Sequence, residues 1–292
     1  MGSVAGKTVF ITGGARGVGA EVARRLHARG AQLVLTDLDE APLAELADAL
    51  GADRVLTRVA DVRDLQAMQE VVDAAVERFG GLDVVMANAG IATYGSVLQV
   101  DPEAFQTLMD VNVTGVFNTV RAALPAVLER RGYVLIVSSL AAYAAAPGLA
   151  PYNASKAAVE HFANALRLEV AHRGVDVGSA HMSWIDTPLV RDTKDDLSTF
   201  GEMLSRLPYP LNQTTSVEQC GQVFVAGIEG RKRHINCPGW VGVLRWLKPV
   251  LSTMVGESRI RGFVPDLLPR MDAEVARLGR SMGSRTKSVE ER

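Results

Sequence analysis

Short apolar runs alternate with longer segments of helical periodicity through the first 240 residues of the chain. The runs are apolar throughout, which is typical of strands that are covered on both faces of a parallel sheet. They occur at residues 8–12, 32–37, 54–61, 83–90, 133–139, 175–181 and 233–240. Helices are predicted at 18–29, 41–50, 102–130 and 217–229, in a segment that ends at Phe79 and after Pro151. Because helical crossovers between parallel strands are right-handed, we predict an α/β fold with a doubly wound, Rossmann-type parallel sheet of about seven strands and helices on both faces.

The chain is long enough for one large domain. It has 292 residues, of which 48% are hydrophobic, although length alone would also allow two domains. We expect one catalytic domain at residues 1–240 and a C-terminal helical extension at 241–292 that the predicted sheet does not need. The final polar stretch, 280–292, is expected to be disordered.

Charge and cysteine content argue against several classes of protein. The net charge of -2 comes without a basic stripe for nucleic acid. Cys220 and Cys237 are too few for a disulfide framework and, like the five histidines, lack metal-site spacing. No apolar stretch reaches the length of a membrane span, and the amino-terminal apolar run is too short for a signal peptide. We expect a cytoplasmic protein without a metal.

A glycine-rich turn at residues 12–19, TGGARGVG, joins the first predicted strand to the first predicted helix. Gly13, Gly17 and Gly19 allow a tight turn and a close approach of the backbone to a diphosphate. The N–H groups that begin at Val18 would then bind the diphosphate at the positive end of the helix. A plain tight turn is the alternative interpretation, because the spacing differs from G-x-G-x-x-G.

Asp37 ends the second predicted strand and can accept hydrogen bonds from the ribose of an adenosine. It would repel a 2′-phosphate, because like charges about 4 Å apart cost roughly 1 to 4 kcal/mol in wet to partly wet surroundings. Arg16 could instead pair with a 2′-phosphate, lie in solvent or bind Asp37. We predict NAD rather than NADP, because an uncompensated Asp excludes the phosphate whereas an Arg merely permits it.

Ser139, Tyr152 and Lys156 form the candidate catalytic set. Tyr152 and Lys156 are four residues apart on a predicted helix and therefore share a face. A tyrosine that removes a proton near neutral pH needs a nearby positive charge, because its ordinary pKa is about 10. Ser139 ends a buried strand, at the edge where open α/β sheets bind ligands. The Y-x-x-x-K pair alone would also fit a coincidence on a helix surface.

Together, in this order, the glycine turn, Asp37, the sequence NAG at 88–90 and the set Ser139, Tyr152 and Lys156 resemble the short-chain dehydrogenase/reductase family over residues 7–240. The resemblance implies that Tyr152 is the general acid/base, that Lys156 activates it and binds the nicotinamide ribose, and that Ser139 holds the substrate oxygen. It implies that Asn112 anchors a water in the proton relay, although a helix-interior Asn bound to backbone is the alternative. Further cofactor-binding residues implied by the resemblance are Asp61, Val62, Asn88, Ala89, Gly90 and Thr187. A homodimer or homotetramer is also implied.

The predicted substrate pocket departs from the family pattern. Met182 and Ser183 replace a usual Pro-Gly pair, and they are expected to form part of the pocket floor. Tyr94, Tyr143 and Trp184 are expected to form aromatic walls. Residues 188–214 fall where the family has a variable lid. Its apolar residues, which are spaced like one helix face, are Leu189, Leu197, Phe200, Met203, Leu204 and Leu207. The alternative is a surface helix that packs on the core.

The extension begins with an amphipathic segment at 241–256 that mixes Trp246 and aliphatic residues with Arg245 and Lys248. We expect it to pack on its own subunit or on a partner. Contact with a membrane surface is the less favoured alternative.

The predicted function is hydride transfer between NAD(H) and a hydrophobic secondary alcohol or ketone. One alternative is an NADP-dependent carbonyl or 3-oxoacyl reductase, and another is a non-catalytic NAD-binding sensor or membrane-surface scaffold.

Overall fold

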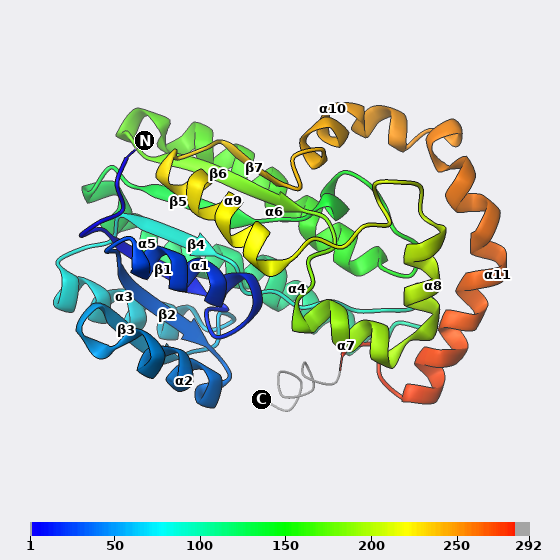
Figure 1. Cartoon of the computed structure of the whole chain (residues 1–292), viewed down its shortest axis with the longest axis horizontal. Coiled ribbons are helices and arrows are strands. Elements are labelled where there is room, and N and C mark those ends of the chain that lie inside the picture. Colours follow the sequence, from blue (N-terminus) through cyan, green and yellow to red (C-terminus); the bar gives the residue numbers. More distant parts are fainter. Residues whose placement is uncertain (1, 284–292) are drawn as a thin grey trace.

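The computed structural model describes residues 2–283, and Figure 1 shows how their helices and strands are arranged. Its seven-stranded sheet has the order β3-β2-β1-β4-β5-β6-β7, and every strand pair is parallel. The strands are β1 (Thr8–Thr12), β2 (Gln32–Asp37), β3 (Val55–Val59), β4 (Val84–Ala87), β5 (Tyr133–Val137), β6 (Asp176–Met182) and β7 (His234–Cys237). The predicted doubly wound sheet is therefore confirmed.

Helices cover both faces of the sheet, as predicted (Figure 1). α1 (Gly17–Ala28), α2 (Glu40–Leu50) and α9 (Val217–Glu229) pack on one face. α3 (Leu65–Phe79), α5 (Gly115–Glu129) and α6 (Ala150–Val170) pack on the other. Successive side chains of a strand point to opposite faces, so Val9 and Ile11 join the first core and Phe10 joins the second. Both faces of β1 are thus buried, which explains its continuous apolar sequence.

Side-chain caps fix where several helices begin. Asp64 precedes α3 and accepts hydrogen bonds from the backbone N–H of Gln66 at 2.8 Å and of Ala67 at 3.3 Å. Asp101 accepts from Glu103 N–H at 2.8 Å at the start of α4 (Pro102–Met109). Such caps satisfy backbone donors that the first helical turn leaves free. The caps therefore fix the residue at which each loop ends and its helix begins.

α4 continues through a π-helical turn (Asp110–Thr114) into α5, so residues 102–129 form one long helical run. By length and composition this run could cross a membrane, but 61% of its most apolar window is buried inside the protein. Its apolar character is explained by its place in the core.

The predicted lid contains two short helices, α7 (Pro188–Asp196) and α8 (Ser198–Arg206). Between them Leu197 adopts an extended conformation, so the apolar residues of the lid do not lie on one continuous helix. Leu197, Phe200, Met203 and Leu204 are all buried in one cluster. These residues therefore pack inward, and a later part of the chain covers them.

That covering part is α11 (Met254–Leu278), which follows α10 (Val241–Leu251) and runs along α8. Phe263, Leu267, Met271 and Val275 recur every four residues and are buried against the lid. Polar contacts add to this packing, because Glu274 accepts hydrogen bonds from the Thr199 backbone N–H at 3.1 Å and hydroxyl at 2.6 Å. α11 thus packs on the lid of its own subunit, whereas in the segment 241–256, for which this packing was expected, Val241 and Leu244 pack but Trp246, Val250 and Met254 are exposed.

The expectation of disorder for residues 280–292 is wrong for 280–283. Arg280 pairs with Asp196 at 2.7 Å. The backbone N–H of Tyr94 donates to the Ser281 carbonyl at 2.8 Å, and Met282 forms a β-bridge with Thr93. Residues 284–292 lie outside the described residues.

Replacing Leu267 with Ala tests whether α11 belongs to the core. Leu267 is 1% exposed, so Leu267→Ala should lower the free energy of unfolding by about 2 to 5 kcal/mol. Leu247→Ala is the matched control in the same extension, because Leu247 is 43% exposed and its loss should cost less than about 0.5 kcal/mol. Equal effects in urea unfolding would show that α11 is not packed as described.

Candidate active site

A cavity of about 410 Å³ opens at the carboxyl ends of the strands, between the sheet and the lid. Open α/β sheets bind ligands at this edge, where the strand order reverses between β1 and β4. Most of the residues singled out in the sequence line it: Gly13, Arg16, Gly17, Val18, Asp37, Asp61, Val62, Asn88, Ala89, Gly90, Tyr94, Ser139, Tyr152, Lys156, Met182, Ser183, Trp184 and Thr187. Gly19, Asn112 and Tyr143 are not among its lining residues.

The glycine turn is pressed against the end of β4. Gly13 has a φ of +63°, and a Cβ there would come within 2.9 Å of Ala89 Cα. The Asn88 side-chain amide donates hydrogen bonds to the carbonyls of Thr12 at 2.9 Å and Gly13 at 3.1 Å. A Cβ at Gly19 would overlap the Gly13 carbonyl oxygen, so this glycine allows close packing of α1 without lining the cavity.

The start of α1 fits an anionic group. No side chain among residues 2–283 caps this helix, and its first turn holds no acid. The first backbone N–H groups of a helix lack intrahelical partners and attract anions. Gly17, with a φ of +52°, faces Thr187 at the start of α7, where a Cβ would lie 3.4 Å from the threonine methyl group. The free N–H groups at the start of α1 therefore offer a binding site for a diphosphate at the cavity wall.

Asp37 lies at the carboxyl end of β2, as predicted from its position in the sequence. Its carboxylate accepts hydrogen bonds from the backbone N–H of Ala15 at 3.0 Å and of Asp39 at 3.3 Å. Burial raises the pKa of Asp37, and these N–H groups oppose part of the rise. Arg16 pairs with Asp39 at 3.3 Å, so Asp37 is not its ion-pair partner.

Asp61 and Val62 form another part of the cavity wall. Asp61 is paired with Arg63 at 2.6 Å, and Val62 is buried with 6% exposure. The side-chain amide of Asn118, in α5, donates to the Val62 carbonyl at 3.0 Å and holds this segment in place. Asp61 and Val62 thus hold fixed positions in the wall, and their contact with an adenine stays a prediction.

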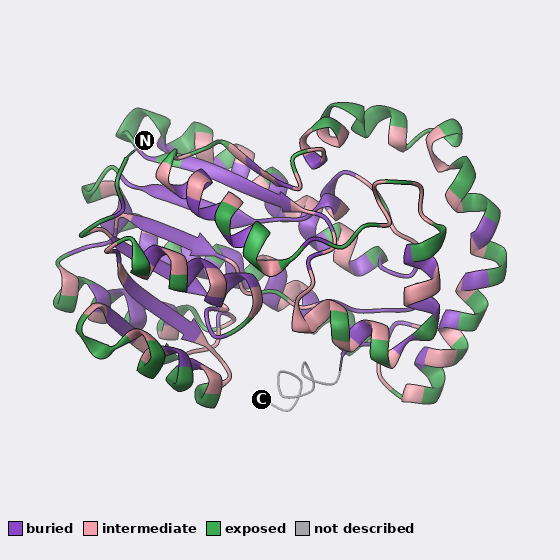
Figure 2. Ribbon diagram, viewed as in Figure 1, coloured by how far each residue is buried: buried purple, intermediate pink, exposed green. Residues whose placement is uncertain are grey.

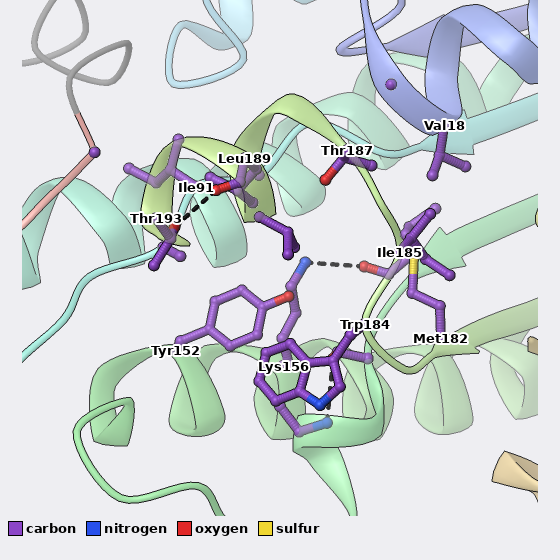
Figure 3. A pocket seen from close by; sticks show the side chains of 18 of the residues that line it. Val18, Ile91, Tyr152, Lys156, Met182, Trp184, Ile185, Thr187, Leu189 and Thr193 are labelled. Carbon is purple, nitrogen blue, oxygen red and sulfur yellow. Dashed lines mark hydrogen bonds between the residues drawn. The ribbon is translucent and has the colours of Figure 1, made fainter. Parts of the chain in front are cut away.

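Tyr152 and Lys156 project from the first turns of α6 into the cavity, and Figure 3 shows them side by side there. A hydrogen bond joins Tyr152 to Ser139, which follows β5. The hydroxyl of the neighbouring Ser138 is engaged elsewhere, because it donates to the Lys156 carbonyl at 2.9 Å. Ser139 is therefore the serine that faces the tyrosine, and a substrate oxygen can contact both hydroxyls.

The predicted activation of Tyr152 by Lys156 has to act against the burial of both side chains. Burial raises the pKa of Tyr152, and the hydrogen bond from Ser139 only partly opposes this rise. The Lys156 ammonium lies 5.6 Å from the tyrosine ring centre and donates to the Val137 carbonyl at 3.1 Å. Burial also lowers the pKa of Lys156 to about 8. The sequence-based argument counted the lysine charge but not the burial of both side chains.

Asn112 sits in the π-helical turn that joins α4 to α5. Its amide oxygen accepts from Ile91 N–H at 2.8 Å, and its amide nitrogen donates to the Ile91 carbonyl at 2.9 Å and to the Ser155 hydroxyl at 3.0 Å. This matches the alternative of an asparagine satisfied mainly by backbone. Asn112 joins the loop after β4 to α6, and its role in a proton relay stays a prediction.

The far part of the cavity is apolar. Tyr94 and Trp184 pack with Phe200 of α8, at ring-centre distances of 5.9 and 5.5 Å. The Tyr94 hydroxyl is hydrogen-bonded to Thr193. Met182 and Ser183 line the wall, and the buried Ser183 hydroxyl has no hydrogen-bond partner among residues 2–283.

The expectation that Tyr143 forms a pocket wall is wrong. Tyr143 follows a short turn (Leu140–Ala142) that directs it behind β6, where it stacks on His181 with ring centres 4.5 Å apart. His181 in turn bonds Glu160 at 2.6 Å, and both are buried. This pair joins α6, which carries Tyr152 and Lys156, to β6.

The extension supplies cavity residues that the sequence-based interpretation missed. Ile260 of α11 and Gly283 line the cavity together with lid residues. The four-residue spacing of Phe263, Leu267 and Met271 was a signal that α11 packs inward, but the interpretation considered only the segment before it.

Three comparisons describe what the chain is similar to. A family model described as short chain dehydrogenase matches residues 7–198. An uncharacterised NAD-dependent oxidoreductase of Mycobacterium tuberculosis is 35% identical over 206 residues, which are 65% of this chain and 75% of that protein. The oxidoreductase UcpA of Salmonella typhimurium is 33% identical over 218 residues, with 71% and 82% covered. A crystal structure of a short chain dehydrogenase from Mycobacterium paratuberculosis bound to NAD has a TM-score of 0.73 and 30% identity, and covers 80% of this chain and 97% of that one.

Glu160 makes a testable contribution to stability behind the site. Burial alone would raise its pKa, but the hydrogen bond and charge of His181 outweigh burial and lower it. Glu160→Gln should therefore destabilise the protein by about 1 to 3 kcal/mol near neutral pH. The difference from the wild type should be fully present above the ordinary glutamate pKa of about 4.3 and be lost as the pH falls through the lowered folded-state value.

Urea unfolding at a series of pH values measures this difference. Glu169→Gln, at an exposed position on the same helix, is the control and should leave stability unchanged. A Glu160→Gln effect that grows as the pH falls would contradict the assignment.

Proposed function

The chain belongs to the short-chain dehydrogenase/reductase family, and from this we propose that it is an NAD-dependent oxidoreductase acting on a hydrophobic secondary alcohol or its ketone. One observation carries the proposal. A single cavity is lined by Ser139, Tyr152 and Lys156 and, a short distance away, by the glycine turn and Asp37. The first group can move a proton to or from a substrate oxygen, and the second fits a dinucleotide.

NAD(H), when bound, supplies the hydride acceptor or donor. The protein's own residues then have the following roles. Ser139 donates a hydrogen bond to the substrate oxygen, and Tyr152 removes the hydroxyl proton during oxidation or returns it during reduction. Lys156 supplies positive charge beside Tyr152, which favours the tyrosine anion that burial alone disfavours. With its pKa lowered to about 8, Lys156 still carries this charge at neutral pH.

Two contacts support NAD over NADP. The half-buried carboxylate of Asp37 faces the cavity at the end of β2, where it can bind ribose hydroxyls and repel a phosphate. Arg16, the residue that could have attracted this phosphate, is engaged by Asp39. The alternative of an NADP-dependent carbonyl or 3-oxoacyl reductase would require Arg16 to leave that pair. The NAD named for the relatives above agrees with this choice.

The apolar part of the cavity supports a lipophilic substrate. Tyr94, Trp184, Phe200 and Met203 line it. Of the described lining residues, only Arg16 and Lys156 are basic, and both belong to the dinucleotide or catalytic part. An anionic substrate would therefore lack a cation in the apolar chamber. A non-catalytic NAD sensor, the remaining alternative, gives no reason for Ser139 to face Tyr152.

Tyr152→Phe tests the proposed acid/base. Loss of the hydroxyl should lower kcat by at least about 100-fold, because a positioned general acid/base contributes that much or more. The NADH dissociation constant, measured by fluorescence, should change by less than about twofold, because the phenyl ring keeps its packing. Tyr143→Phe is the matched control outside the cavity and should keep its activity. Full activity in Tyr152→Phe would overturn the mechanism.

Asp37→Ser tests the choice of cofactor. Removing the carboxylate should shift the ratio of NADP(H) to NAD(H) affinity toward NADP(H) by about tenfold or more, because a like-charge repulsion of about 1 to 4 kcal/mol is lost. Asp192→Asn removes an acid near Tyr94 in the same cavity and should leave this ratio unchanged. A wild-type protein that prefers NADP(H) in the same fluorescence titrations would contradict the role given to Asp37.

A further inference from the structure

α10 carries an apolar stripe that faces solvent. Val243, Trp246, Leu247 and Val250 follow the i, i+3, i+4, i+7 spacing of a helix face, and their exposed fractions are 58%, 79%, 43% and 53%. Figure 2 shows this helix and the beginning of α11 as a largely exposed edge of the molecule. Such a stripe normally faces a core, so its exposure needs a physical explanation.

The exposed stripe continues into α11. It is distinct from the face by which α10 packs on the rest of the protein. Met254 and Val255, at the start of α11, are 76% and 81% exposed. The opposite face of α10 is already buried in part, because Val241 and Leu244 pack with Leu140. We call the six exposed residues of α10 and α11 the α10–α11 patch.

Basic residues surround the α10–α11 patch. Residues 241–262 contain four basic side chains and one acidic one, although the whole chain has a net charge of -2. Lys248, Arg259 and Arg261 are exposed, and Arg261 lies 3.8 Å from the one acid, Glu257. A tryptophan and aliphatic residues flanked by lysine and arginine match the interfacial region of an anionic bilayer.

α11 carries both the end of the α10–α11 patch and one residue of the cavity wall. Ile260 lies on α11, between the exposed Met254 and the buried Phe263, and its side chain lines the cavity. The same helix therefore presents apolar residues to the outside near its start and to the chamber one to two turns later. The patch and the chamber are therefore a short distance apart along one helix.

We propose that the α10–α11 patch binds the surface of an anionic lipid bilayer and places the cavity wall next to the lipid. Delivery of a lipophilic substrate from the bilayer rests on the proposed function, whereas binding to the bilayer does not. Binding would be reversible, because one short helical stripe immerses far less apolar surface than a membrane span.

A second copy of the chain is the competing occupant. A two-fold contact places the same surface patch on both sides of an interface. It would bring Lys248, Arg259 and Arg261 of each copy close to the same basic residues of the other, with only Glu257 in the segment to compensate. Anionic lipid headgroups remove this repulsion, so the charges favour the bilayer.

Co-sedimentation with vesicles tests the proposal. The full chain should pellet with phosphatidylcholine vesicles that contain about 30% phosphatidylglycerol, and much less with pure phosphatidylcholine or in high salt. The double variant Trp246→Glu, Val250→Glu should lower the partition coefficient by about tenfold or more. Leu168→Glu is the matched control, because Leu168 is also 79% exposed but lies near the end of α6. No pelleting of the wild type, or equal pelleting of the double variant, would overturn the proposal.

A second readout reports the depth of Trp246. Its emission should shift to shorter wavelength on the anionic vesicles, and the shift should be absent in Trp246→Phe while that variant still pellets. Light scattering in solution measures the oligomeric state and so tests whether a second copy of the chain occupies the patch. If the wild type forms an oligomer that the double variant does not form, and the wild type does not bind the vesicles, the patch is an interface between copies and the proposal fails.

Tyr152→Phe separates this proposal from the proposed function. It should pellet with the vesicles as the wild type does, because vesicle binding needs no turnover. If the wild type lacked oxidoreductase activity but pelleted with anionic vesicles, only the function would fail. If it were active on a soluble secondary alcohol but ignored vesicles, only the bilayer proposal would fail.

Discussion

The contact between the turn after β1 and the end of β4 is the constraint on which the rest of the site depends. Asn88 binds the carbonyls of Thr12 and Gly13, and Gly13 and Gly19 have no side chains that would hold the segments apart. This close approach fixes the start of α1 beside the point where the strand order reverses. The free backbone N–H groups of α1 and the Asp37 carboxylate therefore lie along one fixed edge, which is where we propose that the dinucleotide binds.

α6 connects this edge of the sheet to the candidate catalytic residues. Its first turns carry Tyr152 and Lys156, and its middle carries Glu160, which binds His181 of β6. Asn112 ties the loop after β4 to Ser155 of the same helix. The Tyr152 hydroxyl, the proposed acid/base, is thus positioned by contacts of α6 to β6 and to the loop after β4, on either side of the strand that leads to Ser139. Rigid support of this kind is what places catalytic groups within reach of one substrate atom.

The sequence allowed the sheet, most helices and the cavity-facing position of most site residues to be predicted, because these follow from local periodicity and from which residues end a strand. Features that depend on tertiary packing were predicted less well. Tyr143 is turned behind β6 by a short turn that no periodicity encodes. Arg16 pairs with Asp39 rather than with Asp37. Burial raises the pKa of Tyr152 and lowers the pKa of Lys156. The packing of α11 was readable from its four-residue spacing, but its partner, the lid, was not.

The way α11 and residues 280–283 complete the chamber has a consequence for synthesis of the protein. All seven strands are present once Cys237 has been made, and with them the glycine turn, Asp37 and the catalytic set. Ile260 and Gly283 of the cavity wall, and the contacts of Glu274 and Arg280 to the lid, come from the last described part of the chain. These parts of the wall therefore leave the ribosome after the whole sheet and the rest of the lining residues. A chain that ended soon after Cys237 would lack Ile260 and Gly283 and the contacts that cover the lid.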